Sequence, residues 1–484
     1  MENKKSLQTR IEKAINMSKV VLHSTKGTTT IEKNTTSFWP LFLFTDSEPD
    51  VPFHDDLIDT CATAMGLIST QILFSQNINP DTKKIINEGA NSLLFMRNTD
   101  GSWPSFIIVD SKEDIQLEGI INDTSFAINA LIRLDFLSEN PIIDKPILDR
   151  YELGPLKNRL NYINQSINWL SENRANKAWS YTGIERFNNK ASVISTTSAT
   201  VSVLNTLQLV YDKIKDHDSV QNENLRLIKL LIEEASEELL VSQSAKGGFS
   251  RQRGEFESIA HTCSALSFFL SSDYDLHKDN LIKAVKWLLN NKNVYTPDKI
   301  NNSDYFDEYA QFVNSDKKVF KKNLIHHETF IDAIIFYTAL LINDDKLKKE
   351  LNIFYKLKLS KLLSVGFENL LKRQSYSGKY LGAFKCRRQI PSEDYPIYGI
   401  QNGVKALNYA KDNFDSYVNM TFFRRKFWTV LAVLAVILLS GSFLFFNIFK
   451  DKSITESVSF AFGLSIIGSI IATVIYESIK KYWP

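Results

Sequence analysis

One stretch of the chain gathers residue types that could do chemistry. The segment GGFSRQRGEFESIAHTCSAL, residues 247–266, places two arginines, a histidine and a cysteine between a Gly-Gly turn and an apolar helical pattern. Guanidinium groups match phosphate oxygens, whereas His261 and Cys263 could equally serve as a helix cap and a small core residue. The segment is therefore either a reactive site or a joint between two structural units.

Three aspartates near residue 55 offer a second candidate. Asp55, Asp56 and Asp59 follow an Asp-Asp-x-x-Asp spacing. On a helix, residues four apart share a face, so Asp55 and Asp59 could hold Mg²⁺. Acidic residues also favour helix N-termini because of the helix dipole, and no partner motif is evident. Magnesium is therefore the less favoured metal.

Helices that start with a threonine must position these residues. The segments DTCATAMGL, DTSFAINAL, TTSATVSVL, HTCSALSFF and ETFIDAIIF share a polar residue, then threonine, then an apolar helical run. Their threonines lie 64 to 73 residues apart, and a weaker sixth copy begins at Ile400. A second helix ending in a small-residue and aromatic turn falls between the copies. Six such helix pairs predict an open superhelix or a closed ring.

The turns DGSW, AWSY and GGFS, each following an apolar helix, resemble the repeats of terpenoid cyclases and protein prenyltransferase β subunits. The resemblance implies an all-α fold, an α/α toroid of about six helix pairs, over residues 50–415, with 1–49 as a preceding segment. The inner helices would begin at the repeated threonines, Thr60, Thr124, Thr197, Thr262 and Thr329, and near Ile400. Their first turns would ring one mouth of a central cavity.

The resemblance also implies site residues. By likeness to zinc-dependent prenyltransferases, His261, Cys263 and His327 would bind Zn²⁺, with one coordination position open for a substrate thiol. Arg251 and Arg253 would hold a diphosphate. The pattern departs from the family at His261, where the family has Asp, and Glu255 and Glu257 would repel the diphosphate.

By likeness to class II terpene cyclases, Asp123 occupies part of their acidic motif. Its neighbour Asn122 stands where the proton-donating acid belongs. Because an amide cannot donate that proton, this route looks closed.

Composition narrows the class of protein. The 484-residue chain carries a formal charge of +2, which gives no electrostatic argument for nucleic acid. Three widely spaced cysteines fit free thiols better than a disulfide framework. The N-terminus shows no apolar signal segment.

Two uncharged runs near the C-terminus, residues 427–449 and 458–476, predict a transmembrane hairpin within 416–484. Basic residues concentrate on its outer flanks, which predicts a multi-pass protein of the inner membrane with both termini and the toroid in the cytoplasm. Small residues every four positions, Ala461, Ser465, Ser469 and Thr473, favour packing against the first span or between subunits.

Two functions follow from these features. The favoured hypothesis is a non-catalytic or non-standard toroid that binds an isoprenoid, lipid or peptide and signals through the hairpin. This arrangement is analogous to bacterial membrane effectors, including those of antiviral defence. The alternative is a membrane-tethered, zinc-dependent enzyme similar to prenyltransferases or cyclases that uses an isoprenoid diphosphate.

Overall fold

The protein is described by a computed structural model that divides it into two units, Met1–Tyr417 and Val418–Pro484. The structure describes residues 4–449 apart from a set of internal segments: 32–33, 41, 44–56, 76–77, 109–117, 181–194, 217–221, 273–276, 297–306, 314–318, 326–327, 345–346, 379 and 386–394.

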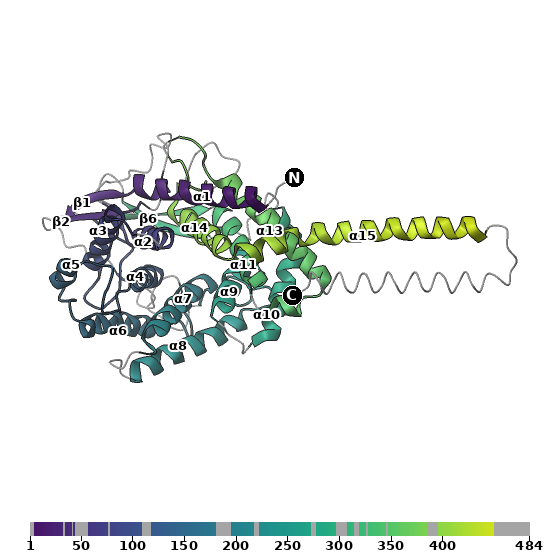
Figure 1. The fold of residues 1–484 in the computed structure, drawn as a ribbon. Helices are drawn as coiled ribbons and strands as arrows, with labels where there is room; N and C mark the ends of the chain where they lie inside the picture. The colour runs from purple at the N-terminus through teal and green to yellow at the C-terminus, as the bar shows by residue number, and fades with distance from the viewer. Residues whose placement is uncertain are drawn as a thin grey trace. The chain divides into compact units, whose positions relative to one another are not determined.

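A closed ring of helices forms the centre of the first unit (Figure 1). Each inner helix packs on the next along the chain, and the last packs back on the first. The inner helices are α2 (Thr60–Phe74), α4 (Ile121–Arg133), α7 (Thr197–Ile214), α9 (Ile259–Ser271), α11 (Glu328–Asp344) and α14 (Ile397–Asp412). The predicted toroid is therefore confirmed, and the predicted inner-helix starts lie within three residues of the observed ones.

One outer helix packs against each inner helix. The outer helices, in chain order, are α1 (Lys4–Ser24), α3 (Pro80–Met96), α6 (Leu156–Glu172), α8 (Asn222–Val241), α10 (Lys278–Asn290) and α13 (Ile353–Arg373). The sequence placed α1 in a segment before the toroid. In the structure α1 packs on α14 and α2, so the N-terminal helix closes the outer layer beside the last inner helix.

Short elements fill the connections. Two short helices, α5 (Lys145–Arg150) and α12 (Leu347–Glu350), and a 3₁₀ turn, η4 (Lys292–Tyr295), accompany the outer layer. The described strands pair only as two-stranded antiparallel ladders: β1 (Gly27–Ile31) with β2 (Asn34–Phe38), β3 (Phe42–Leu43) with β8 (Tyr395–Pro396), β4 (Leu57–Asp59) with β5 (Phe106–Ile108), and β6 (Asp307–Val313) with β7 (Val319–Ile325). These ladders decorate a helical ring and form no sheet core.

A buried aromatic residue marks the joint between an outer helix and the next inner helix. The aromatics are fully buried at five joints: Trp39, Trp103, Trp179, Phe249 and Phe384. At three of them the indole N–H donates to a carbonyl of the preceding outer helix: Trp39 to Leu22 at 3.0 Å, and Trp103 to Leu93 and Trp179 to Leu170 at 2.7 Å each. The aromatic ring thus fixes how each outer helix turns back toward the ring.

Threonines explain why the repeat pattern was visible in the sequence. The Trp103 and Phe249 backbone N–H groups donate to the hydroxyls of Thr124 and Thr262 on the following inner helix, at 2.9 and 2.8 Å. The preceding inner helix contributes as well, because the Thr197 hydroxyl donates to the Ser250 carbonyl at 2.6 Å. A joint is thereby held between two successive inner helices, and buried backbone groups that would otherwise lack partners are satisfied.

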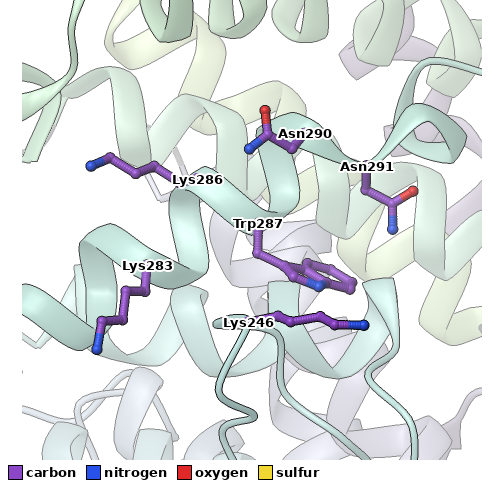
Figure 2. Close-up of a pocket in the computed structure, with 6 residues that line it drawn as sticks. All are labelled: Lys246, Lys283, Lys286, Trp287, Asn290 and Asn291. Atoms are coloured by element: carbon purple, nitrogen blue, oxygen red, sulfur yellow. The ribbon is translucent and has the colours of Figure 1, made fainter.

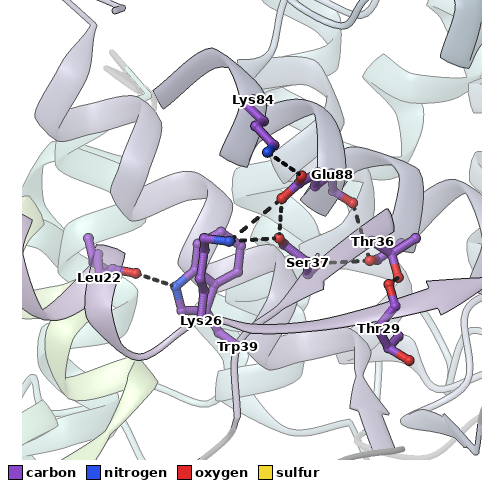
Figure 3. A network of polar contacts seen from close by, with 9 residues as sticks. Leu22, Lys26, Thr29, Thr36, Ser37, Trp39, Lys84 and Glu88 are labelled. Atoms are coloured by element: carbon purple, nitrogen blue, oxygen red, sulfur yellow. Dashed lines mark hydrogen bonds and ion pairs between the residues drawn. The ribbon is translucent and has the colours of Figure 1, made fainter. Parts of the chain in front are cut away.

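A polar network ties the first joint to α3 (Figure 3). The Glu88 carboxylate accepts from the Ser37 hydroxyl at 2.6 Å and lies 3.6 Å from the Lys26 ammonium and 3.8 Å from Lys84. Glu88 is largely buried, so this carboxylate needs these partners to offset the loss of water. The network holds the chain after α1 against the second outer helix.

The C-terminal unit corrects the membrane prediction. Helix α15 (Phe414–Phe449) carries Arg424, Arg425 and Lys426 ahead of its apolar part. Within the described part of the chain, no helix is long and apolar enough to cross a membrane. The predicted multi-pass inner-membrane location is therefore wrong. The second run, 458–476, lies outside the described residues.

Candidate functional site

Three inner helices turn a partly polar face toward the axis of the ring. On α7, Ser198, Ser202 and Asn205 retain partial exposure and are spaced by four and three residues, so they share one helix face. Helices α4, α8 and α9 cover the other sides of α7. The uncovered face therefore points toward the axis.

The α4 helix presents a matching face. Phe126, Asn129 and Arg133 keep partial exposure at a spacing of three and four residues, whereas most of α4 is buried. Hydrogen bonds connect this helix to α7: the Ser125 and Ser202 hydroxyls lie 3.1 Å apart, and the Asn129 amide donates to the Thr206 hydroxyl at 3.3 Å. The Asn129 carbonyl oxygen accepts from the Arg133 Nε at 2.8 Å, which orients the guanidinium.

One tyrosine inside the ring interacts with two cations, through a close contact with one and electrostatically with the other. Tyr337 belongs to α11, which lies opposite α4 in the ring, yet its phenol interacts electrostatically with Arg133. The Lys405 ammonium of α14 lies 4.3 Å from the centre of the Tyr337 ring, and Tyr409 packs edge-on against the same ring at 5.5 Å. Side chains of α4, α11 and α14 therefore converge on the axis.

The electrostatics of this cluster favour a negative ligand. Burial lowers the pKa of Arg133, and the Tyr337 phenol offsets only part of that effect. Among the ion pairs of the described residues, neither Arg133 nor Lys405 contacts a carboxylate. A buried cation without an anionic partner loses hydration energy that a bound anion would restore. We call Arg133, Tyr337 and Lys405 the axial cluster.

Apolar residues lie between the polar groups around the axis. On α2, Cys61 and Ile72 keep partial exposure, and Met65 and Ile68 lie on the same helix face with only slight exposure. On α11, Ile334 and Leu341 flank Tyr337 at helical spacing and keep slightly more exposure than their neighbours. Polar, charged and apolar side chains are therefore interspersed around the axis.

The predicted zinc ligands lie on α9. His261 is buried, and its Nδ1 lies 2.6 Å from the hydroxyl of Ser258, the N-cap residue of the helix. Burial, with a smaller effect of Arg251, lowers the pKa of His261 to about 3. Cys263 is fully buried, and burial raises the pKa of its thiol to about 12 despite a hydrogen bond from Thr338. A zinc-binding thiol must ionise, and this environment opposes ionisation.

His261 and Cys263 lie two residues apart near the start of α9, and both side chains are buried. No group of three histidines, cysteines or acids suited to a metal occurs among the described residues. His327 lies outside the described residues. The three-residue zinc site therefore stays a prediction.

The predicted diphosphate ligands belong to the joint before α9. The Arg251 carbonyl accepts from the Thr197 N–H at 2.9 Å, so this residue serves the joint through its backbone, and its half-buried side chain acts electrostatically on His261. Arg253 is exposed in the adjoining turn. The two arginines therefore differ in exposure, Arg251 being half-buried and Arg253 exposed. A role for them in binding a diphosphate stays a prediction.

Two predicted acids have structural positions. Asp123 is buried in the first turn of α4, beside Asn122. Asp59 is the N-cap of α2, where its carboxylate accepts from the Ala62 N–H at 2.6 Å. Asp55 lies outside the described residues, so the magnesium pair is not brought together in the described structure. The cap agrees with the alternative that acids here stabilise a helix start.

Solved structures share this fold. The chain is similar to the cellobiose 2-epimerase of Spirochaeta thermophila DSM 6192, with a TM-score of 0.57 and 9% identity over 86% of this chain and 98% of the epimerase. The chain is also similar to a D-mannose isomerase, with a TM-score of 0.52 and 10% identity over 82% of this chain and 97% of the isomerase. The type II terpene cyclase MstE from Scytonema superposes less well, with a TM-score of 0.43 and 10% identity over 84% of this chain and 99% of the cyclase.

The likenesses to the epimerase and the isomerase establish the class of fold, an α/α toroid. No family model and no curated protein matches the sequence.

Proposed function

We propose that the protein binds a small, hydroxyl-rich anion, of the sugar-acid type, in the axis of its toroid. The observation that carries this proposal is the axial cluster, in which Lys405 lies over the Tyr337 ring, Tyr337 acts electrostatically on Arg133, and no carboxylate contacts either cation among the described ion pairs. A carboxylate of the ligand would accept from the Arg133 guanidinium, whose fork of donors suits that geometry.

The remaining walls support a hydroxyl-rich body for this ligand. Ser198, Ser202 and Asn205 supply donors and acceptors along α7, and Met65 and Ile68 supply an apolar surface for the carbon face of a ring. An isoprenoid chain would leave the charges of Arg133 and Lys405 without an anionic partner, at a cost in binding free energy. A polar ligand is therefore favoured over the isoprenoid, lipid or peptide expected from the sequence.

The fold neighbours point the same way. The epimerase and the isomerase named above act, by their names, on cellobiose and D-mannose, and both fold as the same ring. A sugar-derived ligand in this axis is consistent with that use of the fold, and the cationic cluster adds a preference for an acid.

Calorimetric titration with glucuronate, galacturonate and their neutral parent sugars tests the proposal. The wild-type chain should bind at least one acid more tightly than its neutral parent, and the Arg133→Gln, Lys405→Gln double variant should lose that preference. A matched control, Lys157→Gln with Lys229→Gln on the exposed surfaces of α6 and α8, changes the net charge equally and should bind as wild type. Equal binding of acids and neutral sugars would refute the proposal.

A further inference from the structure

A cavity lies on the outer layer, away from the axis. It is a hollow of about 450 Å³ lined by three lysines, a tryptophan and two asparagines: Lys246, Lys283, Lys286, Trp287, Asn290 and Asn291 (Figure 2). Five of these residues lie on α10 or directly follow it, and Lys246 comes from the joint between α8 and α9. We call this hollow the lysine pocket.

Two glycines bring the joint against α10 and so form the pocket. Gly247 has a φ of +107°, and a Cβ there would lie 2.6 Å from the Lys283 carbonyl oxygen. A Cβ on Gly248 would lie 2.6 Å from Cε2 of the Trp287 indole. The Gln243 amide donates to the carbonyls of Gly247 and Asn280, both at 2.9 Å. The Gly-Gly-Phe turn is therefore clamped to α10 with Lys246 at its tip.

The far end of the pocket is fixed by α13. The Asn290 amide donates to the Tyr355 hydroxyl at 3.3 Å and accepts from the Lys358 ammonium. Lys286 and Lys358 both lie near the Tyr355 ring, at 5.8 and 5.5 Å from its centre. A fourth ammonium group thus stands beside the three that line the hollow, and the asparagine between them is held in place.

The charge of the pocket is unbalanced. Among the described ion pairs, none involves Lys246, Lys283 or Lys286. Glu257 belongs to the same joint, and its carboxylate interacts electrostatically with Lys246. Trp287 stays partly exposed, so one side of its indole is available to a flat or ring-shaped group.

We infer that the lysine pocket binds a phosphorylated small molecule whose ring stacks on Trp287, as a nucleotide or a sugar phosphate would. Lysine ammonium groups bind phosphate oxygens as point charges, and the Asn290 and Asn291 side chains offer polar contacts for the ring. The volume admits a ligand of that size, since small-molecule pockets begin at about 300 Å³. This site is separate from the axial cluster and does not depend on it.

The test uses the full chain and three probes: ATP, glucose 6-phosphate and inorganic phosphate, titrated by calorimetry at low and at physiological salt. At least one ring-bearing phosphate should bind more tightly than inorganic phosphate. The Lys283→Gln, Lys286→Gln variant should weaken it at least about tenfold, because two of the pocket's charges are removed. Which probe binds best separates the nucleotide from the sugar phosphate.

Two further variants and a control test the role of Trp287 and the independence of this site from the axial cluster. Trp287→Leu should weaken the ring-bearing probe and leave inorganic phosphate nearly unchanged, and the Lys157→Gln, Lys229→Gln control should match wild type. The Arg133→Gln, Lys405→Gln variant should still bind the probe, which separates this site from the axial one. Absence of binding by all three probes, or equal loss in the control, would overturn the inference.

Discussion

The Tyr337 phenol on α11 acts electrostatically on the Arg133 guanidinium on α4, although α4 packs mainly on α2, α7 and α6 and α11 mainly on α9, α13 and α14. Neighbouring inner helices could place two such residues together by ordinary packing. Opposite helices can do so only if both side chains point toward the axis. This relationship therefore defines the inner surface of the toroid more directly than any single exposed residue.

The first prediction concerns the effect of Arg133 on the free energy of unfolding. Replacing Arg133 with Met should leave the free energy of unfolding unchanged or raise it by up to about 2 kcal/mol, because a buried cation without an anionic partner gives way to an apolar chain. Urea denaturation measures the change. The stabilised variant should no longer prefer acidic ligands.

Arg159 provides the contrast for this experiment. It is equally an arginine within the helical layers, but its guanidinium donates to the carbonyls of Phe136, Leu153 and Ser138 at 2.6, 2.9 and 2.7 Å. Arg159→Met should cost about 3 kcal/mol, since those buried acceptors lose their donors. Similar losses for both variants would contradict the distinction between a structural arginine and a ligand-binding one.

The second prediction tests the glycine at the joint before α9. Gly248→Ala should destabilise the protein by about 1–3 kcal/mol, because the new methyl group would collide with the Trp287 indole and the Glu257 side chain. Thermal unfolding followed by circular dichroism measures it. Gly254→Ala is the control: its φ of +89° costs about 1 kcal/mol, but nothing lies within 4 Å of the added Cβ.

The third prediction concerns the threonine that made the repeats visible. Thr262→Val should cost about 1–3 kcal/mol, because the buried Phe249 N–H loses the hydroxyl that accepts its hydrogen bond at 2.8 Å. Thr262→Ser keeps the hydroxyl and should recover most of the loss. If serine and valine destabilise equally, the hydroxyl does not hold the joint.

These joints also explain what the sequence could predict. Thr124 and Thr262 are each the fourth residue of an inner helix and accept from a backbone N–H of the preceding joint. Thr60 and Thr197 instead begin their helices and donate to a carbonyl of the next joint. Both roles require a hydroxyl near the start of an inner helix, which is why threonines recur at nearly regular spacing.

The joint after α1 also has a recognisable sequence. The Trp-Pro pair of SFWP around Trp39 matches that of GSWP around Trp103, and both indoles donate a hydrogen bond to an outer helix. That signal could have placed α1 in the toroid.

No sequence pattern identified the residues of the axial cluster. In the sequence Arg133 is a basic residue in the last turn of a helix, where such residues are common, and Lys405 is one of many lysines. Only the closure of the ring sets Arg133 opposite α11. The lysine pocket was partly visible, because the Gly-Gly turn was noted, but its partner α10 could be found only from packing.

The last prediction uses the buried histidine of α9. His261 has a folded-state pKa of about 3 because burial disfavours the imidazolium, whereas in the unfolded chain it titrates near 6.5. Between these values the unfolded chain binds the extra proton. Lowering the pH through this window should therefore reduce the free energy of unfolding by up to about 1.4 kcal/mol per pH unit, or about 2 kcal/mol by pH 5, from this residue alone.

Urea denaturation curves at pH 7, 6 and 5 for the wild type and for His261→Gln isolate the effect. The difference in unfolding free energy between the two proteins should shrink by about 2 kcal/mol as the pH falls from 7 to 5. A difference that stays constant with pH would mean that the folded protein takes up the proton as readily as the unfolded chain.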